Sequence, residues 1–186
     1  LPNDHSLIRM GFWPGGDRDG NPFVKSETTL QVAEALRGGI IKCYYLEVRK
    51  LKRRLTFEGV DLALTELEKQ LYDNIFIPGN RTDLSKDEIL ETLHDISNTL
   101  IRQHNGLFIN LVKNLINKVE IFGLHFASLD IRQESSIHDK VLNTIAAETE
   151  FLPSDYSRLS VEEKTSLLTN ISTYISDVTF EDPLVS

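Results

Sequence analysis

Residues 26–55 read SETTLQVAEALRGGIIKCYYLEVRKLKRRL, which is the longest regular pattern in the chain. The apolar side chains recur there at steps of three and four residues, at Val32, Leu36, Ile40, Tyr44, Val48, Leu51 and Leu55. This spacing places them on one face of an α-helix. We therefore expect one long amphipathic helix, weakened near Gly38 and Gly39 because glycine destabilises a helix interior.

Two further features lie within this stretch. A basic run surrounds Leu51, and we interpret it as a solvated helix face; it consists of Arg49, Lys50, Lys52, Arg53 and Arg54. Cys43 is the only cysteine of the chain, so it cannot form an internal disulfide. We interpret it as a small buried hydrophobic side chain, which fits a reducing cytoplasm.

Outward from this stretch, similar stripes predict more helices, around residues 64–75, 89–100, 108–119, 137–145 and 167–175. The first of them should end at the turn Pro78-Gly79-Asn80. Two have a capping box at their start, a serine followed three residues later by a glutamate: Ser85 with Glu88, and Ser160 with Glu163.

Strand patterns are short: one precedes the first helix, and the other lies between the fourth and the fifth. Residues 6–13 predict a short strand or extended run, ended by Pro14-Gly15-Gly16. Residues 123–132 alternate as a strand does, with apolar residues on both faces until Arg132. That pattern is typical of a strand buried on both sides whose carboxyl end alone reaches a pocket. The predicted fold is mainly α, with about six helices and one or two short strands in a single piece spanning residues 1–186.

Composition narrows the classes of function. The 186 residues have a formal net charge of −8, which argues against a nucleic-acid partner and against an anionic membrane surface. No apolar stretch approaches the roughly 20 residues that span a bilayer, and no signal-peptide pattern stands at the start. The chain begins at Leu1 rather than methionine. We expect it to be a piece of a longer protein.

A polar loop between Asp17 and Pro22 combines anion donors and cation acceptors. A calcium-binding loop is rejected, because Pro22 stands where an EF-hand needs glycine and Thr28 stands where it needs glutamate. Two interpretations stay open at this point: a solvated turn whose charges pair locally, and a binding loop.

Arg132 raises a sharper question, because it follows apolar residues of the predicted strand and must find a partner or water. One interpretation is an internal ion pair with Asp130 or Glu134. The other is a guanidinium held on a rigid strand and directed at a phosphate or carboxylate. The second is favoured if the strand belongs to a parallel barrel, since active sites lie at the carboxyl ends of such strands.

The histidines give little guidance to chemistry. His94, His104 and His125 are not at metal-ligand spacing with a cysteine or a second histidine, so we expect structural roles for them. No metal site is predicted from the residues of this chain.

Two segments carry a resemblance to a known family. Residues 12–22, FWPGGDRDGNP, are similar to the loop that phosphoenolpyruvate carboxylases usually write as SWMGGDRDGNP. Residues 129–135, LDIRQES, match a strand end of the same family, and residues 122–124 resemble its lead-in. The chain thus resembles an internal fragment of a phosphoenolpyruvate carboxylase. Pro14 departs from the usual methionine and alters the backbone next to Trp13.

The resemblance implies a large cytoplasmic enzyme, usually a homotetramer, with many helices around a (β/α)₈ barrel. It implies a carboxy-lyase that joins phosphoenolpyruvate and bicarbonate to give oxaloacetate and phosphate, with Mg²⁺ or Mn²⁺. The oxaloacetate would supply the tricarboxylic acid cycle. In the family mechanism, phosphoryl transfer to bicarbonate gives carboxyphosphate and an enolate. The enolate then attacks the CO₂ that carboxyphosphate releases.

Carried over by position, the resemblance assigns Arg132 a catalytic role in binding the phosphate of phosphoenolpyruvate or carboxyphosphate. Trp13 would line the apolar pocket beside the methylene carbon of the substrate. Gln133 and Glu134 would orient the Arg132 guanidinium.

Arg18 is expected to bind substrate at the mouth of the barrel, supported by Asp17, Asp19 and Asn21. The family's essential histidine is expected before Leu1, and its metal-binding carboxylates after Ser186, so the isolated chain should be inactive. The alternative is a helical scaffold or anion-binding module that carries the loop without the chemistry.

Overall fold

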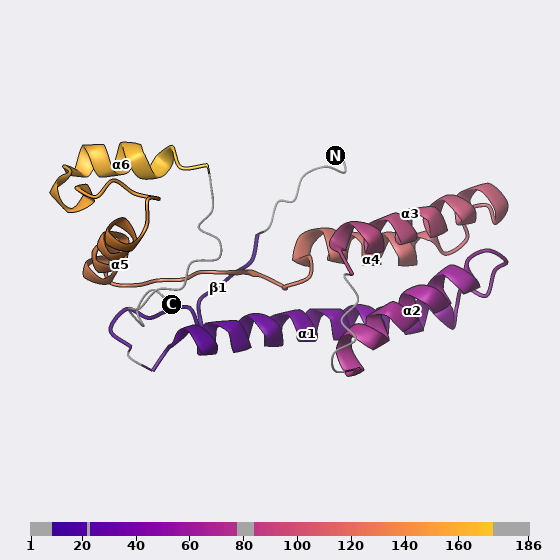
Figure 1. Ribbon diagram of the computed structural model, residues 1–186. Helices are drawn as coiled ribbons and strands as arrows, with labels where there is room; N and C mark the ends of the chain where they lie inside the picture. Colours follow the sequence, from indigo (N-terminus) through magenta and orange to yellow (C-terminus); the bar gives the residue numbers. More distant parts are fainter. Residues whose placement is uncertain (1–8, 22, 78–83, 173–186) are drawn as a thin grey trace. The chain divides into compact units, whose positions relative to one another are not determined.

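The computed structural model describes residues 9–21, 23–77 and 84–172, and it is mainly α-helical, as the sequence predicts (Figure 1). Its elements in chain order are β1 (Gly11–Phe12), α1 (Ser26–Lys52), α2 (Asp61–Phe76), α3 (Lys86–Gln103), α4 (Ile109–Phe122), β2 (Ser128–Leu129), α5 (Ser135–Glu148), the 3-10 helix η1 (Tyr156–Arg158) and α6 (Val161–Thr169). The predicted turn at residues 78–80 lies outside the described residues. None of the described helices combines the length and apolar character that a membrane span needs.

The chain divides into two compact units. Unit 1 comprises residues 1–17 and 22–131, and unit 2 comprises residues 18–21 and 132–186. The chain passes from one unit to the other at 17/18, 21/22 and 131/132, and all three points lie within the two segments that resemble the carboxylase family.

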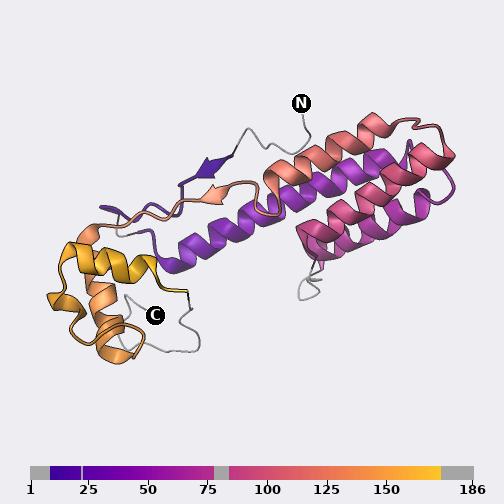
Figure 2. The same ribbon diagram turned by 90° about the horizontal axis from the view of Figure 1, so that it is seen from above.

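Helices α1 to α4 of unit 1 form a four-helix bundle. Each helix contacts the next along the chain, and α4 returns to contact α1, so the ring is closed (Figure 2). The interior is filled by side chains that the predicted stripes supply, among them the fully buried Val48, Leu64, Leu93, Leu100 and Val119. Burial of these apolar surfaces is the main favourable contribution to the stability of such a bundle.

The stripe of α1 is buried only in its second half. Ile40, Tyr44 and Val48 lie in the core, whereas Val32 and Leu36 are half-buried. Helix α1 runs unbroken through Gly38 and Gly39, and its first half extends past the other bundle helices in Figure 2. The helix is therefore long enough to carry a second contact near its start.

The prediction for Cys43 was wrong, since its side chain is exposed. Cys43 precedes the buried Tyr44 by one residue, which is a rotation of about 100° around a helix with 3.6 residues per turn. The residue type favoured burial, but the helical phase directs the side chain toward solvent.

Both predicted capping boxes are confirmed. Ser85 Oγ accepts from the Glu88 N–H at 3.2 Å, and Glu88 Oε2 accepts from the Ser85 N–H at 2.8 Å. Ser160 and Glu163 repeat the arrangement at 3.3 and 2.8 Å. The pKa of each glutamate is lowered, first because its carboxylate accepts the backbone N–H of the serine and second because it accepts the serine hydroxyl.

Unit 2 has a smaller core between α5, η1 and α6. Its buried members are Ile145, Ala146, Leu152 and Tyr156. Lys164 of α6 bonds Asp139 of α5 at 3.0 Å, and its ammonium lies 5.0 Å from the centre of the Tyr156 ring. Six half-buried apolar side chains pack against these four residues, so the core of unit 2 is small and only partly closed.

The strands are much shorter than predicted. β1 and β2 form a two-stranded parallel sheet in which Gly11 pairs with Ser128 and Phe12 with Leu129. Alternation cannot start earlier in residues 123–132, because Phe126 has a left-handed φ of 67°. The expected burial of both faces is also wrong, because Ser128 of β2 is exposed and Leu129 is only half-buried.

Candidate functional site

The turn that follows β1 is tied to the start of α1. Trp13 C=O accepts from the N–H groups of Gly16 at 2.9 Å and Asp17 at 3.2 Å, which closes the turn. Thr29 Oγ1 donates to Gly15 C=O at 2.7 Å. Gly15 has a left-handed φ of 82°, and a Cβ there would lie 2.5 Å from Val32 Cγ2. Position 15 therefore requires glycine for both conformation and space.

The second glycine brings the two family-like segments together. A Cβ on Gly16 would lie 2.2 Å from Asp130 C=O, so only glycine permits this approach of backbone to backbone. The strand pairing supports it, because the Ser128 N–H donates to Met10 C=O at 2.9 Å and the Asp130 N–H donates to Phe12 C=O at 2.8 Å. Residues more than 110 positions apart in the sequence are thus neighbours in unit 1.

The predicted arginines are joined through their backbones in unit 2. The Arg18 N–H donates to Arg132 C=O at 2.8 Å, and the Asn21 N–H donates to Arg18 C=O at 3.2 Å. Gly20, at φ 66°, supplies the left-handed residue of this turn. The Arg18 residue is half-buried, and Arg132 is exposed.

Gln133 and Glu134 shape the start of α5. Gln133 Oε1 accepts from the Glu134 N–H at 3.0 Å, and Glu134 Oε1 accepts from Ser136 Oγ at 2.7 Å. Both side chains therefore hold the transition from strand end to helix. Their predicted role in orienting Arg132 stays a prediction.

The remaining predicted residues differ in exposure. Trp13 is 59% exposed, which leaves much of the indole surface uncovered. Asp17 is half-buried, and Asp19 and Asn21 are exposed. In the part of the chain that the structure describes, no group of three or more His, Cys, Asp or Glu side chains is placed to hold a metal ion.

Sequence reasoning missed a residue that fixes the path toward β2. The Tyr44 hydroxyl lies 2.7 Å from Gly123 C=O and 3.3 Å from Lys118 C=O, at the end of α4. Burial raises the pKa of this phenol, with a smaller effect of Cys43 in the same direction. The neutral hydroxyl thus donates to the point where the chain leaves the bundle. The stripe pattern alone treated Tyr44 as an ordinary core residue.

The comparison with protein families agrees with this geometry. A family model described as Phosphoenolpyruvate carboxylase matches residues 1–77 and 63–173, which together cover most of the chain. The chain belongs to the phosphoenolpyruvate carboxylase family. The predicted family resemblance is therefore confirmed over far more of the sequence than the two short segments that first indicated it.

Curated phosphoenolpyruvate carboxylases from several bacteria are similar to the chain. The protein of Thermosynechococcus vestitus is 30% identical over an alignment 223 residues long. That alignment covers 92% of this chain and 22% of the relative. The protein of Shewanella halifaxensis is 29% identical over 90% of this chain and 22% of its own length. That of Shewanella sediminis is 26% identical over the whole chain and 23% of its own length. The chain spans about a fifth of these phosphoenolpyruvate carboxylases.

Proposed function

We propose that this chain forms part of the active site of a phosphoenolpyruvate carboxylase, which carboxylates phosphoenolpyruvate with bicarbonate to give oxaloacetate and phosphate. The observation that carries the proposal is the meeting of the two family segments. Gly16 packs against Asp130 in unit 1, and Arg18 bonds Arg132 in unit 2. Such backbone contacts, which exclude any side chain at Gly16, support a close approach of the loop to the strand end within each unit.

Arg132 is proposed to bind the phosphate of phosphoenolpyruvate or carboxyphosphate. A guanidinium offers a planar set of donors that matches phosphate oxygens in a bidentate way. Negative charge moves between oxygens during phosphoryl transfer, so a fixed cation stabilises the transition state more than the free reactants. The position of Arg132 after β2, at the carboxyl end of a parallel strand, is where barrel enzymes place such groups.

Trp13 and Arg18 complete the proposed contribution. The uncovered indole of Trp13 offers apolar surface for the methylene carbon of the substrate, where exclusion of water protects an enolate from protonation. Arg18 is proposed to bind substrate anions from the half-buried side of the loop, with Asp17, Asp19 and Asn21 holding the loop in shape.

The metal and the larger assembly are proposed for the complete enzyme. The described residues do not fit a Mg²⁺ or Mn²⁺ site, so no step through the metal is assigned to them, and its ligands are proposed to come from other parts of the enzyme. We propose a cytoplasmic homotetramer with a (β/α)₈ barrel to which β1 and β2 contribute. The 186-residue chain by itself is proposed to be inactive.

The test is Arg132→Ala in the complete enzyme, with oxaloacetate formation as the assay. We expect kcat/KM to fall by about 100-fold or more, as for loss of a donor that stabilises transition-state charge. Arg132→Lys should restore only part of the activity, because lysine lacks the bidentate fork. Arg102→Ala, at an exposed arginine of α3, serves as the matched control. Near-normal activity of Arg132→Ala would refute the phosphate-binding role.

A further inference from the structure

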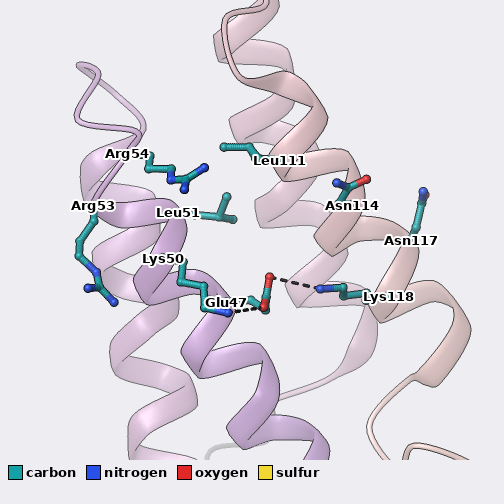
Figure 3. Close-up of a pocket in the computed structure, with 9 residues that line it drawn as sticks. All are labelled: Glu47, Lys50, Leu51, Arg53, Arg54, Leu111, Asn114, Asn117 and Lys118. Atoms are coloured by element: carbon teal, nitrogen blue, oxygen red, sulfur yellow. Dashed lines mark hydrogen bonds and ion pairs between the residues drawn. The ribbon is translucent and has the colours of Figure 1, made fainter.

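A basic groove lies between the second half of α1 and helix α4, within the four-helix bundle of unit 1. It encloses about 680 Å³ and is lined by Glu47, Lys50, Leu51, Arg53, Arg54, Leu111, Asn114, Asn117 and Lys118 (Figure 3). Volumes of this size fall in the range that small-molecule sites occupy, about 300–1,000 Å³. None of the lining residues belongs to the proposed active site.

The charge of the groove is opposite to that of the chain. Four cations and one carboxylate line it, although the chain as a whole has a net charge of −8. Glu47 bonds Lys50 at 3.0 Å and Lys118 at 3.3 Å, so one carboxylate is shared between two ammonium groups. The pKa of Glu47 is lowered, chiefly because its carboxylate accepts a hydrogen bond from Lys50. Positive charge therefore remains in excess.

Arg54 takes no part in the ion pairs of Glu47 with Lys50 and Lys118. Its side chain extends toward α4 above the Glu47 carboxylate, whereas Arg53 points away from α4 (Figure 3). Arg53 Nε donates to Arg49 C=O at 3.4 Å and so satisfies the end of α1. Helix-end cations commonly have that structural role. In the part of the chain that the structure describes, the Arg54 side chain makes no hydrogen bond or ion pair, although its backbone N–H donates to Leu51 C=O.

We propose that the groove binds a small organic anion with at least two negative charges, a phosphate ester or a di- or tricarboxylate. Arg54 contacts it through the guanidinium fork, and Lys50 and Lys118 add charge from the two facing helices. Asn114 donates from α4, and the apolar Leu51 and Leu111 contact the carbon part of the ligand. A singly charged anion gains less, because Glu47 already occupies part of the positive field.

Isothermal titration calorimetry of the 186-residue chain with citrate, glycerol 3-phosphate and acetate tests the proposal. We expect saturable binding of citrate, glycerol 3-phosphate or both, with the stronger of the two identifying the ligand class. Acetate should bind at least about tenfold more weakly, because it carries a single charge. Binding should disappear at about 1 M ionic strength, where the Debye length is about 3 Å. In NMR spectra, the Asn114 side-chain amide should shift with citrate or glycerol 3-phosphate.

Three variants assign the site. Arg54→Ala should weaken binding at least about tenfold, which is the usual loss for a hydrogen bond to a charged group. Lys113→Ala removes an exposed cation of α4 outside the groove and should leave binding unchanged. Glu47→Gln should strengthen binding, because it releases Lys50 and Lys118 to the ligand. An unfolding effect cannot produce that opposite sign.

The proposal is overturned if neither polyvalent anion saturates, or if acetate binds as tightly as citrate. It is equally overturned if Arg54→Ala and Lys113→Ala lose affinity alike, or if Glu47→Gln weakens binding. These outcomes are independent of the carboxylase assay, since they use the isolated chain and residues outside the proposed active site.

Discussion

Leu64, Leu93 and Leu100 in the four-helix bundle are completely buried, whereas Trp13 and Ile131 beside the strand pair are more than half exposed. Here the strand pair means β1 and β2 with the turn from Trp13 to Gly16. The bundle is held by apolar burial, which tolerates changes that preserve volume. The strand pair is held by a few backbone hydrogen bonds and by two glycines packed against neighbouring atoms. The segments that identify the family therefore contribute little core and depend on backbone fit.

The strongest test of this contrast removes a buried side chain from the bundle. Leu93→Ala should lower the free energy of unfolding by about 2 to 5 kcal/mol, because it leaves a cavity in a closed interior. Leu62 of α2 is 74% exposed and is the matched control. Leu62→Ala should change stability by no more than about 0.5 kcal/mol. Urea denaturation followed by circular dichroism measures both, and equal effects would contradict a buried core at Leu93.

Gly16→Ala should damage the strand pair instead. The added Cβ meets Asp130 C=O, and such overpacking costs about 1 to 3 kcal/mol. We expect faster hydrogen exchange at the Ser128 and Asp130 amides, while the bundle amides keep their protection. Gly11→Ala, in β1, is the control, because its Cβ would meet Asp130 Oδ2 at an ordinary 3.5 Å. Unchanged exchange in Gly16→Ala would break the comparison.

Substitutions in the two capping boxes test whether units 1 and 2 lose stability separately. Ser85→Ala and Ser160→Ala should each cost about 1 kcal/mol, the first in unit 1 and the second in unit 2. Residue-resolved hydrogen exchange should show each loss within its own unit. A loss that spreads equally through both units would show that they unfold together.

The same boxes predict a dependence on pH. The pKa values of Glu88 and Glu163 are lower in the folded chain than their ordinary value of 4.5. Their stabilisation is therefore fully present above the ordinary pKa and is lost as the pH falls through the folded one. An NMR titration should place both carboxylates below 4.5, and Ser85→Ala should return Glu88 toward that value.

The smallest effect is expected in the part of α1 beyond the bundle. Gly38→Ala should stabilise the chain by about 0.5 to 1 kcal/mol, since the position is helical and a Cβ there meets nothing within 4 Å. Gly59→Ala is the contrasting control, because Gly59 has a left-handed φ of 79° and should be destabilised by substitution. Thermal unfolding measures both changes, and a destabilised Gly38→Ala would indicate a functional or packing demand at this glycine.

The sequence predicted most of the bundle because the apolar spacing of a helix is a local pattern. The steps of three and four residues located α1 to α4, and Ser85 and Ser160 marked two helix starts. The sequence could not give the length of β2, since that depends on how many residues of the distant β1 segment pair with it. It also could not give the approach of Gly16 to Asp130, which depends on two distant backbones. Cys43 failed because residue type was weighed above helical phase.

The candidate site was predictable only in part. The pattern of residues 12–22 and 129–135 identified the family, and the structure brings the adjoining backbones together. The roles of Arg132, Trp13 and Arg18 stay predictions, because they concern ligands. The groove at Arg54 could not be foreseen from the basic run, since four of its nine lining residues come from α4.

Tyr44 limits which relatives of this chain can exist. A phenylalanine would fit the same apolar stripe and would satisfy any rule based on hydropathy. It would, however, leave Gly123 C=O without the hydroxyl that lies 2.7 Å away. A second change that supplies another donor at the end of α4 would offset the loss of this hydroxyl. We expect the two positions to covary, so that an aligned set of family members would record a hydrogen bond as a correlation between two columns.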